Sequence, residues 1–342
     1  MGPPTAEAVT IIGAGLAGTT LAWALHRLGR PFLLVDAEAP VTSSRIAAGL
    51  MTPITGKRLA KSWRWDNCRP AAERFYRFVE VETDSRFFHP RPIVRLFTSE
   101  LERQRFTDHR EQFAGLVEHP TRLVDDWKVS NPFGGFVMPT AAQLDVATYL
   151  DASREWFKRR GLFKREVVPL GSLPSEEGGK VILCHGYLSE SHPAFSAVKF
   201  RPAKGEILTV RIPELNERRI LNRGGFWVAP TGSPDVYRVG ATYSWHQLDH
   251  MSTPAGRKEL EDRLRELVNV PHEVIGHDAA VRPIVEGQKP RLGLHPTTAR
   301  LGYFNGLGSK GSLLAPLFAQ QLAAYLSGMG TIDPEVDVRV LL

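Results

Sequence analysis

One stretch near the start of the chain reads Val9-Thr10-Ile11-Ile12-Gly13-Ala14-Gly15-Leu16-Ala17-Gly18. Its apolar beginning is typical of a buried strand, and its glycines have the spacing Gly-x-Gly-x-x-Gly. A helix-like segment (19–28) follows, and then a second apolar strand (32–35) that runs into Asp36. The order of strand, glycine turn, helix, strand and acid predicts a βαβ unit with parallel strands.

Each glycine of this motif has its own task. Gly13 permits a tight turn, Gly15 lets a pyrophosphate approach the backbone, and Gly18 allows the helix to pack on the strand. The N-terminus of the helix then faces the phosphate charge, and Asp36 is placed to accept hydrogen bonds from ribose hydroxyls. The unit therefore predicts a dinucleotide site. Its predicted contacts are Gly13, Ala14, Gly15, Leu16, Ala17, Gly18 and Asp36.

The composition is that of an ordinary globular protein, since 42% of its 342 residues are hydrophobic and 23% are charged. That length favours two lobes over one compact unit. The sequence shows neither a membrane-spanning apolar run nor the regions of a signal peptide, so we expect a cytoplasmic protein without membrane association. Its two cysteines, Cys68 and Cys184, lie outside any Cys-x-x-Cys motif, which argues against a disulfide scaffold and against a metal site.

The rest of the chain predicts a change of sheet type near residue 200. Strands at 164–168 and 181–186 are expected to join the first two in a parallel sheet. Strands at 204–212, 225–229 and 237–242 have no long helices between them, which is typical of antiparallel pairing. Further strands are expected at 273–285 and 299–304, and helices at 63–83, 100–113, 145–160, 254–268 and 313–327.

These elements predict an α/β fold (α+β overall), in which a Rossmann-like nucleotide-binding lobe is joined to a second lobe built on a mixed, largely antiparallel sheet. Residues 1–55, 140–195 and 275–342 are expected to form the nucleotide-binding domain. Residues 56–139 and 196–274 are expected to form the substrate domain. A small substrate would be buried between the two lobes.

Four more stretches carry recognisable motifs. They are Ser43-Ser44-Arg45-Ile46-Ala47-Ala48-Gly49-Leu50, Leu183-Cys184-His185-Gly186, Val281-Arg282-Pro283-Ile284 with Pro290-Arg291-Leu292-Gly293, and Phe304-Asn305-Gly306-Leu307-Gly308-Ser309-Lys310-Gly311-Ser312-Leu313-Leu314-Ala315-Pro316. Together with the dinucleotide motif they resemble the D-amino-acid-oxidase (DAO) family of FAD-dependent oxidoreductases. The segment Gly-Leu-Gly-Ser-Lys-Gly is most similar to the sequence of a branch of that family that modifies tRNA.

The resemblance implies FAD as the cofactor. It places these further residues at the FAD: Ser44, Arg45, Ala48, Gly49, Leu50, Val167, Gly186, Arg282, Gly306, Gly308, Ser309, Lys310, Gly311 and Ser312. Lys310 would add positive charge at the flavin N1–C2=O edge, although a lysine on a turn is equally often a solvent-facing residue. Members that bind flavin covalently use a cysteine near the Arg-Pro motif, and neither cysteine of this chain falls there, so we expect non-covalent FAD.

Four residues are the candidates for catalysis and substrate binding. The resemblance makes Arg282 the partner of a substrate carboxylate, because a guanidinium binds a carboxylate with two hydrogen bonds. The alternative for Arg282 is an internal ion pair. Trp227 and Tyr243 would wall an apolar pocket over the flavin or donate a hydrogen bond, unless they are ordinary core aromatics, and Lys310 completes the set. His185 stands where the family has a small residue, and the sequence offers no role for it.

The family implies an enzyme that oxidises the C–N bond of a small amino acid or N-substituted glycine. Hydride would pass from the carbon next to nitrogen to flavin N5, and the imine product would hydrolyse in water. Oxygen or another electron acceptor would reoxidise the flavin, so the sequence leaves open whether the enzyme is an oxidase or a dehydrogenase.

Two other functions stay open. The first is a tRNA-modifying oxidase that removes carboxymethyl from a carboxymethylaminomethyl wobble uridine. It would use the net charge of +6 and two basic clusters, which otherwise are solvated faces. The clusters are Lys57, Arg58, Lys61, Arg64, Arg69, Arg74 and Arg77, and Lys158, Arg159, Arg160, Lys164 and Arg165. The second is a flavin-binding sensor without turnover.

Overall fold

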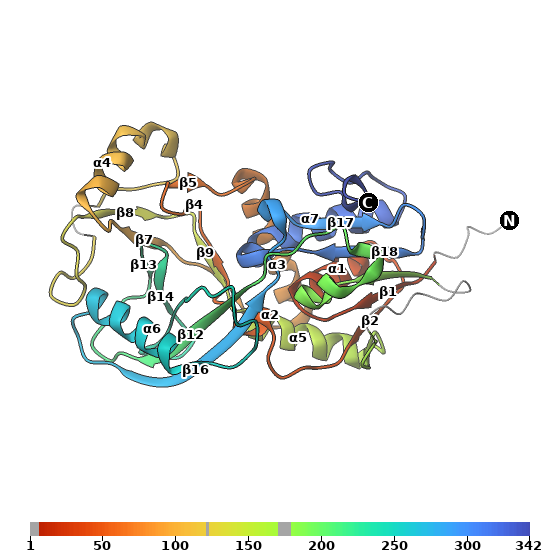
Figure 1. Ribbon diagram of the computed structural model, residues 1–342, viewed down its shortest axis with the longest axis horizontal. Helices are drawn as coiled ribbons and strands as arrows, with labels where there is room; N and C mark the ends of the chain where they lie inside the picture. The colour runs from red at the N-terminus through yellow and green to blue at the C-terminus, as the bar shows by residue number, and fades with distance from the viewer. Residues whose placement is uncertain (1–6, 121–122, 170–178) are drawn as a thin grey trace.

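The computed structural model describes residues 7–120, 123–169 and 179–342. Within them, one sheet has six strands in the order β10-β2-β1-β11-β18-β17. Its strands β1, β2, β17 and β18 are labelled in the half of Figure 1 that holds the C-terminus. Its strands are β1 (Val9–Ile12), β2 (Phe32–Asp36), β10 (Phe163–Arg165), β11 (Lys180–Leu183), β17 (Arg291–Leu294) and β18 (Leu301–Asn305). All neighbours pair in parallel except β17 and β18, which are antiparallel. The predicted parallel βαβ unit is therefore confirmed.

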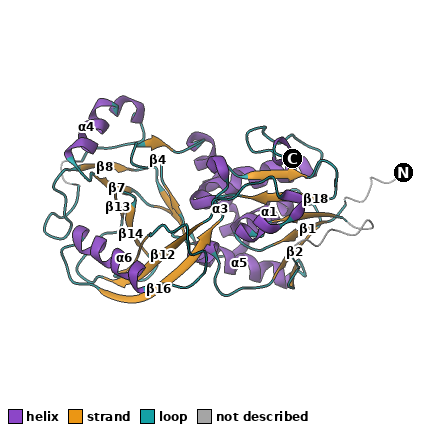
Figure 2. Cartoon of the chain, in the orientation of Figure 1, coloured by secondary structure: helices purple, strands orange, loops and turns teal. Residues whose placement is uncertain are grey.

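Helices pack against one another beside this sheet (Figure 2). They are α1 (Leu16–Arg27), α3 (Trp65–Thr83), α5 (Val146–Arg159) and α7 (Gly311–Leu326). The Tyr76 hydroxyl of α3 donates a buried hydrogen bond of 3.0 Å to the carbonyl oxygen of Ser312 in α7. That carbonyl is available because Pro316, four residues further along α7, has no N–H to donate to it. The proline inside α7 thus leaves a carbonyl oxygen that accepts a hydrogen bond from α3.

The second sheet of the described residues has seven strands in the order β16-β12-β15-β14-β13-β7-β8. Its strands are β7 (Ile93–Leu96), β8 (Gly135–Met138), β12 (Ala203–Arg211), β13 (Ile220–Arg223), β14 (Phe226–Pro230), β15 (Val236–Gly240) and β16 (Glu273–Arg282). Only β13 and β7 pair in parallel in this sheet of described residues. The predicted mixed, largely antiparallel lobe is confirmed.

One face of the second sheet is covered by α6 (Pro254–Leu267) (Figure 1). Leu260 and Leu264 of this helix form a buried cluster with Val210 of β12 and Val239 of β15. Because side chains alternate between the two faces of a strand, the neighbouring residues of β12 and β15 face the opposite way. That opposite face is the one on which the functional site is built.

Further short elements lie between these strands and helices. They are α2 (Ser43–Ile46), β3 (Leu50–Met51), β4 (Ile54–Thr55), β5 (Ala60–Lys61), β6 (Phe88–Pro90), α4 (Glu100–Asp108) and β9 (Ala142–Leu144). Strands β3, β9 and β6 form a small sheet, and β4 pairs with β5. No helix of the described residues has the length and apolar character needed to cross a bilayer.

The ends of some elements differ from the sequence expectation. Helix α1 begins at Leu16, three residues early, because the preceding glycine already caps it. The helix expected at 100–113 ends at Asp108 and continues as a short 3₁₀ turn. Strand β16 ends at Arg282 because Pro283 has no N–H for the ladder. The division into two domains stays a prediction, and its boundary at 274/275 falls inside β16.

Gly18→Ala is predicted to destabilise the protein, because a Cβ there would lie 1.9 Å from the carbonyl oxygen of Gly13. Relief of this overlap requires a shift between β1 and α1, which costs about 1–3 kcal/mol of the free energy of unfolding. Urea unfolding followed by circular dichroism measures the loss. Gly232→Ala is the matched control, since no atom lies within 4 Å of a Cβ there. Equal losses in both variants would contradict this account.

Candidate active site

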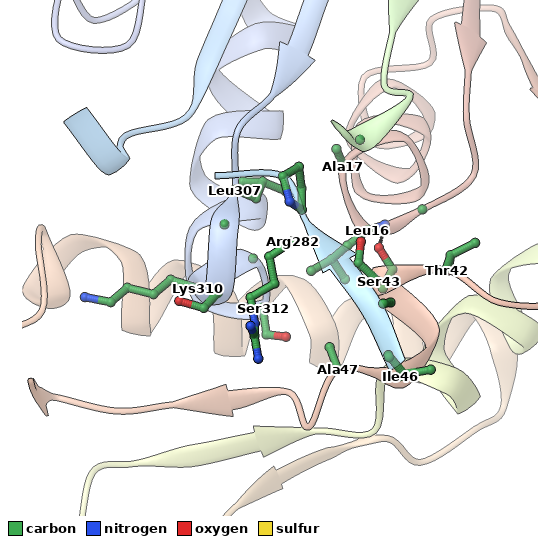
Figure 3. Close-up of a pocket in the computed structure, with 18 of the residues that line it drawn as sticks. Leu16, Ala17, Thr42, Ser43, Ile46, Ala47, Arg282, Leu307, Lys310 and Ser312 are labelled. Atoms are coloured by element: carbon green, nitrogen blue, oxygen red, sulfur yellow. Dashed lines mark hydrogen bonds between the residues drawn. The ribbon is translucent and has the colours of Figure 1, made fainter. Parts of the chain in front are cut away.

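A cavity of about 880 Å³ extends from the carboxyl ends of β1, β2 and β11 to the face of the seven-stranded sheet that α6 leaves uncovered. Its walls are the glycine turn after β1, helix α2, the N-terminus of α7 and residues of β7, β12, β13, β14 and β16. In the view of Figure 3, Arg282 lies between Lys310 on one side and Leu16 and Ser43 on the other. The cavity therefore reaches from one sheet to the other. In α/β folds, ligands commonly bind at the carboxyl ends of the parallel strands, where one end of this cavity lies.

The glycine turn forms one end of the cavity. Gly13 has a φ of +105°, and a Cβ there would lie 2.6 Å from the carbonyl oxygen of Cys184, the residue after β11. Gly15 lines the cavity as the N-cap of α1, and the Ser44 hydroxyl accepts a 3.0 Å hydrogen bond from the Leu16 N–H. This end thus offers the N-terminus of a helix and a hydroxyl in the geometry that suits a phosphate group.

Asp36 lies beside this turn at the end of β2. One of its carboxylate oxygens accepts a 2.7 Å hydrogen bond from the Ala14 N–H, and the other accepts one of 2.6 Å from the Glu38 N–H. Asp36 therefore helps to fix the glycine turn. A carboxylate oxygen accepts more than one hydrogen bond, so Asp36 remains able to bind ribose hydroxyls.

The glycine-rich loop after β18 supplies a second helix N-terminus. Gly308 has a φ of +55°, and Gly311 begins α7. A Cβ at Gly311 would lie 2.7 Å from the side chain of Leu16, so this glycine lets α7 pack closely against the start of α1. Both helix N-termini then meet at the cavity, where their partial positive charges favour an anionic ligand.

Lys310 lies in the same loop and lines the cavity. Burial lowers the pKa of its ammonium. Its Nζ is 3.4 Å from the hydroxyl oxygens of Thr55 and Ser62, and no carboxylate of the described residues pairs with it. Of the two alternatives for Lys310, the solvent-facing turn residue therefore does not fit this position.

Arg282 reaches across the second sheet from β16. A Cβ on Gly205 of β12 would lie 2.0 Å from its Nη2 atom, so the guanidinium rests directly on the backbone of Gly205. Both terminal nitrogens are 3.4 Å from the carbonyl oxygen of Thr242, and the guanidinium carbon is 4.2 Å from the centre of the Tyr243 ring. Burial lowers the pKa of this guanidinium. Within the described residues, no carboxylate pairs with it.

The two candidate aromatic residues have different settings. The Trp227 indole lies over Gly240 of β15, where a Cβ would be 2.7 Å from the ring. Tyr243 follows β15 and is 49% exposed, which places it at the margin of the cavity under the Arg282 guanidinium. Both residues line the cavity. Trp227 also packs against the main buried cluster, whereas Tyr243 does not belong to the core.

The cavity gathers most of the residues that the sequence singled out. Those that line it are Gly13, Gly15, Leu16, Ala17, Asp36, Ser44, Ala48, Gly49, Leu50, Val167, Gly186, Trp227, Tyr243, Arg282, Gly308, Ser309, Lys310, Gly311 and Ser312. Those that do not are Ala14, Gly18, Arg45 and Gly306. Gly18 acts through packing, as described above. The guanidinium of Arg45 instead binds both carboxylate oxygens of Asp151 on α5, at 2.6 and 2.9 Å, which raises its pKa.

Sequence reasoning missed the residues that make room for the candidate side chains. Gly205 and Gly240 lie inside strands, where a glycine often marks the close approach of another group. The glycines could be seen in the sequence, but the sequence does not show which side chain approaches each of them. Arg95 and Asn222 also line the cavity, from β7 and β13. Nothing in the local sequence connects them, because they are neighbours only through sheet register.

His185 lines the cavity just after β11. Burial lowers its pKa to about 4, so the imidazole is neutral at pH 7, and its Nδ1 atom is buried without a hydrogen-bond partner among the described residues. Asp36 is the last residue of β2 and His185 follows β11, and these two strands lie on either side of β1. A neutral imidazole at the dinucleotide end of the cavity is thus free to donate to, or accept from, a bound ligand.

The glycine turn, the acid and the two helix N-termini around one long cavity define a protein that binds a dinucleotide. The family described as FAD dependent oxidoreductase, or DAO, matches residues 8–325. The chain belongs to this family, as its motifs predicted. It is therefore an oxidoreductase that depends on a flavin cofactor.

The chain is similar to known proteins in both sequence and structure. It is 24% identical over 357 residues to the tRNA 5-methylaminomethyl-2-thiouridine biosynthesis bifunctional protein MnmC of Marinobacter nauticus, covering 93% of this chain and 55% of that protein. It is 29% identical over 335 residues to MnmC of Maricaulis maris, covering 94% and 52%. The chain thus spans about half the length of these relatives. The structure of glycine oxidase from Geobacillus kaustophilus superposes with a TM-score of 0.80 at 19% identity, covering 95% of this chain and 96% of that one.

The residues present fit FAD. Gly15 has no Cβ and lines the cavity, so a pyrophosphate can approach the backbone there, next to the Ser44 hydroxyl. Asp36 suits the ribose, and Lys310, which has no carboxylate partner among the described residues, suits the electron-rich edge of a reduced flavin. The same cavity is lined by the residues of the dinucleotide motif and by Trp227, Tyr243 and Arg282.

Gly15→Val is predicted to give folded but colourless protein. A Cβ at this position already lies 3.1 Å from the Ser44 hydroxyl oxygen, and the two further methyl groups would occupy the space for the pyrophosphate. Circular dichroism reports the fold, and the absorbance of the flavin relative to protein reports the FAD content. Yellow protein with a normal FAD content would contradict the assignment of this turn.

Acid is predicted to destabilise the protein partly through His185. A histidine whose pKa is about 4 when folded and about 6.5 when unfolded binds its proton more readily in the unfolded state between those values, so stability falls as the pH falls through this window. Between pH 7 and pH 5, the wild type should lose about 1–2 kcal/mol more than His185→Ala. Urea unfolding at the two pH values measures the difference, and identical losses would contradict the buried neutral state.

Proposed function

We propose that the enzyme oxidises the C–N bond of a small amino acid or an N-substituted glycine, and that the substrate carboxylate binds Arg282. The observation that carries this proposal is a buried guanidinium in the cavity without a carboxylate partner among the described residues. A buried charge without a partner is costly, and a carboxylate ligand with two parallel hydrogen bonds would offset that cost. The alternative of an internal ion pair has no acid to supply it within the described chain.

The site would act mainly by orientation. FAD, when bound, supplies the hydride acceptor at its N5 atom. Arg282 would fix the substrate carboxylate and thereby the carbon next to nitrogen, while Trp227 and Ile207, which line the same face of the sheet, would exclude water from it. A neutral amine needs no general base for this step, so the cavity does not require an acid–base pair. The imine product would hydrolyse in water.

The flavin is proposed to be bound without a covalent link. Burial raises the pKa of the Cys68 thiol to about 12, and burial also raises the pKa of the Cys184 thiol. The thiolate is the nucleophilic form of cysteine, so both thiols are poorly suited to attack a flavin. Denaturation should therefore release all of the flavin into the supernatant.

A second candidate is oxidation of an N-substituted glycine carried on tRNA. It is favoured by the likeness to two MnmC proteins, whose printed names concern tRNA 5-methylaminomethyl-2-thiouridine biosynthesis. The basic clusters give it less support, because many of their cations pair with acids. Examples are Lys61 with Asp66, Arg69 with Glu73, and Lys158 with Glu38. Reduction of the flavin by hypomodified tRNA that weakens steeply with added salt would favour this candidate.

Arg282→Ala is predicted to raise the KM for a carboxylated amine roughly 30- to 1000-fold, since truncation removes a buried charge pair. This increase corresponds to a loss of about 2–4 kcal/mol of binding free energy. Arg282→Lys should recover only part of this loss, because an ammonium lacks the two-pronged geometry. Arg211→Ala is the control, since Arg211 lies exposed on β12 and pairs with Glu273 outside the cavity. The FAD content of all three variants reports whether the cofactor site is intact.

An unchanged KM in Arg282→Ala would remove Arg282 from the substrate site. Absence of flavin reduction by any amine in the wild type would instead favour a flavin-binding sensor without turnover.

A further inference from the structure

The cavity extends past Trp227 to a second set of polar side chains, which we call the distal cluster and define as Arg95, Asn222 and Lys310. The family motifs account for Lys310, whereas Arg95 and Asn222 belong to no motif found in the sequence. The inference drawn from this cluster rests on the proposed function, because it concerns the part of the substrate that Arg282 does not bind.

Arg95 is held rigidly in the distal cluster. Its side chain is 3% exposed, and its Nη2 atom donates to Glu102 at 2.5 Å. Glu102 is itself fixed, because the Thr98 N–H and hydroxyl both donate to its second oxygen, at 2.7 and 2.6 Å. The ion pair is therefore electrically neutral and well supported. The Nε atom of Arg95 is buried and has no hydrogen-bond partner among the described residues.

Asn222 is oriented by Arg95. Its side-chain oxygen accepts a 2.9 Å hydrogen bond from Arg95 Nη1, which assigns the two ends of the amide. The amide nitrogen is then the end left for a ligand, and it makes no hydrogen bond to any described residue. Asn222 lines the cavity, so this donor is available to a bound molecule.

Lys310 joins the cluster through the segment after β4. Its ammonium is 3.4 Å from the Thr55 hydroxyl oxygen, and the adjacent Gly56 carbonyl oxygen is 3.4 Å from Arg95 Nη2. The polar groups that the cluster leaves open are thus all donors, and Glu102 balances only one of the two cations. Such a set suits a ligand group that is rich in acceptor oxygens, namely a carboxylate or carbonyl.

Sheet register fixes the separation between this cluster and Arg282. Asn222 pairs with Trp227, and Trp227 pairs with Gly240, so these residues share one face of the sheet. The Arg282 guanidinium lies over β12, and three strand spacings of about 4.8 Å separate β12 from β13, or roughly 14 Å. Side chains reach toward each other across part of that distance. A ligand that touches both ends must still be of the order of 10 Å long.

We propose that the distal cluster is a second substrate subsite, which binds acceptor oxygens at the far end of an extended N-substituent while Arg282 binds the glycine carboxylate. The N-substituent would cross the sheet over Trp227. Glycine and sarcosine leave the subsite empty. The preferred substrate is thus an N-substituted glycine whose substituent ends in a carboxylate or carbonyl group.

Unreactive carboxylates test this subsite without any turnover. The purified holoenzyme is titrated with glutarate, suberate and sebacate, and with the monocarboxylates of equal chain length, while the flavin absorbance spectrum is recorded. The wild type should bind sebacate or suberate about tenfold more tightly than the matched monocarboxylate, and glutarate with little or no such advantage. Asn222→Leu, which removes the donor, should abolish the advantage.

Asn222→Asp provides a second variant that retains an oxygen acceptor for Arg95 and so preserves the local fold. It should also abolish the advantage, because it replaces the donor with a negative charge. Asn67→Asp on the exposed side of α3 is the matched control for that change of charge. The readout in each variant is the ratio of dicarboxylate to monocarboxylate affinity, so a general change in binding does not count as loss of the advantage.

The outcomes separate the subsite from the proposed function. If long dicarboxylates bind the wild type no better than monocarboxylates, or keep their advantage in both Asn222 variants, the subsite is wrong while the carboxylate site at Arg282 stands. If no carboxylate of either kind perturbs the flavin, the proposed function and the subsite both fail.

Discussion

The contact between the glycine turn and α1 constrains the whole nucleotide-binding lobe. A Cβ at Gly18 would overlap the carbonyl oxygen of Gly13, and a Cβ at Gly13 would overlap that of Cys184, so strand, turn and helix meet with no room for a side chain. This close approach aims the N-terminus of α1 at the cavity. Helix α7 then packs against the start of α1 at Gly311 and brings a second helix N-terminus to the same place. Two aligned sets of N–H groups make the cavity suitable for an anionic cofactor.

Glycines also make room for a close approach in the second lobe, at the substrate end of the cavity. Gly205 leaves space for the Arg282 guanidinium, and Gly240 leaves space for the Trp227 indole. Both long side chains therefore lie flat on the sheet, and the sheet becomes the floor of the cavity. Helix α6 closes the other face with leucines. The cavity and the surface differ in how their positive charges are paired. Arg282 and Lys310 line the cavity without acid partners in the described chain, while most cations of the basic clusters form ion pairs at the surface.

The local sequence predicted the features that depend on residues close together in the chain. The βαβ unit follows from Gly13, Gly15 and Gly18 between two apolar strands, and the second sheet follows from strands that lack intervening helices. Contacts that depend on register could not be predicted in this way. Arg95 and Asn222 are 127 residues apart and meet only because β7 and β13 pair in parallel. Arg45 was expected at the cofactor, but nothing in its local sequence indicates that α5 brings Asp151 to it.

The account depends on a flavin that a carboxylated amine reduces within this cavity. Anaerobic titration of the purified protein with glycine, sarcosine, D-alanine, D-proline and hypomodified tRNA, followed by flavin absorbance, tests that claim most directly. The account predicts that at least one of these amines bleaches the oxidised flavin band. A flavin that is bound but is bleached by none of these amines would leave the fold intact and contradict the proposed chemistry.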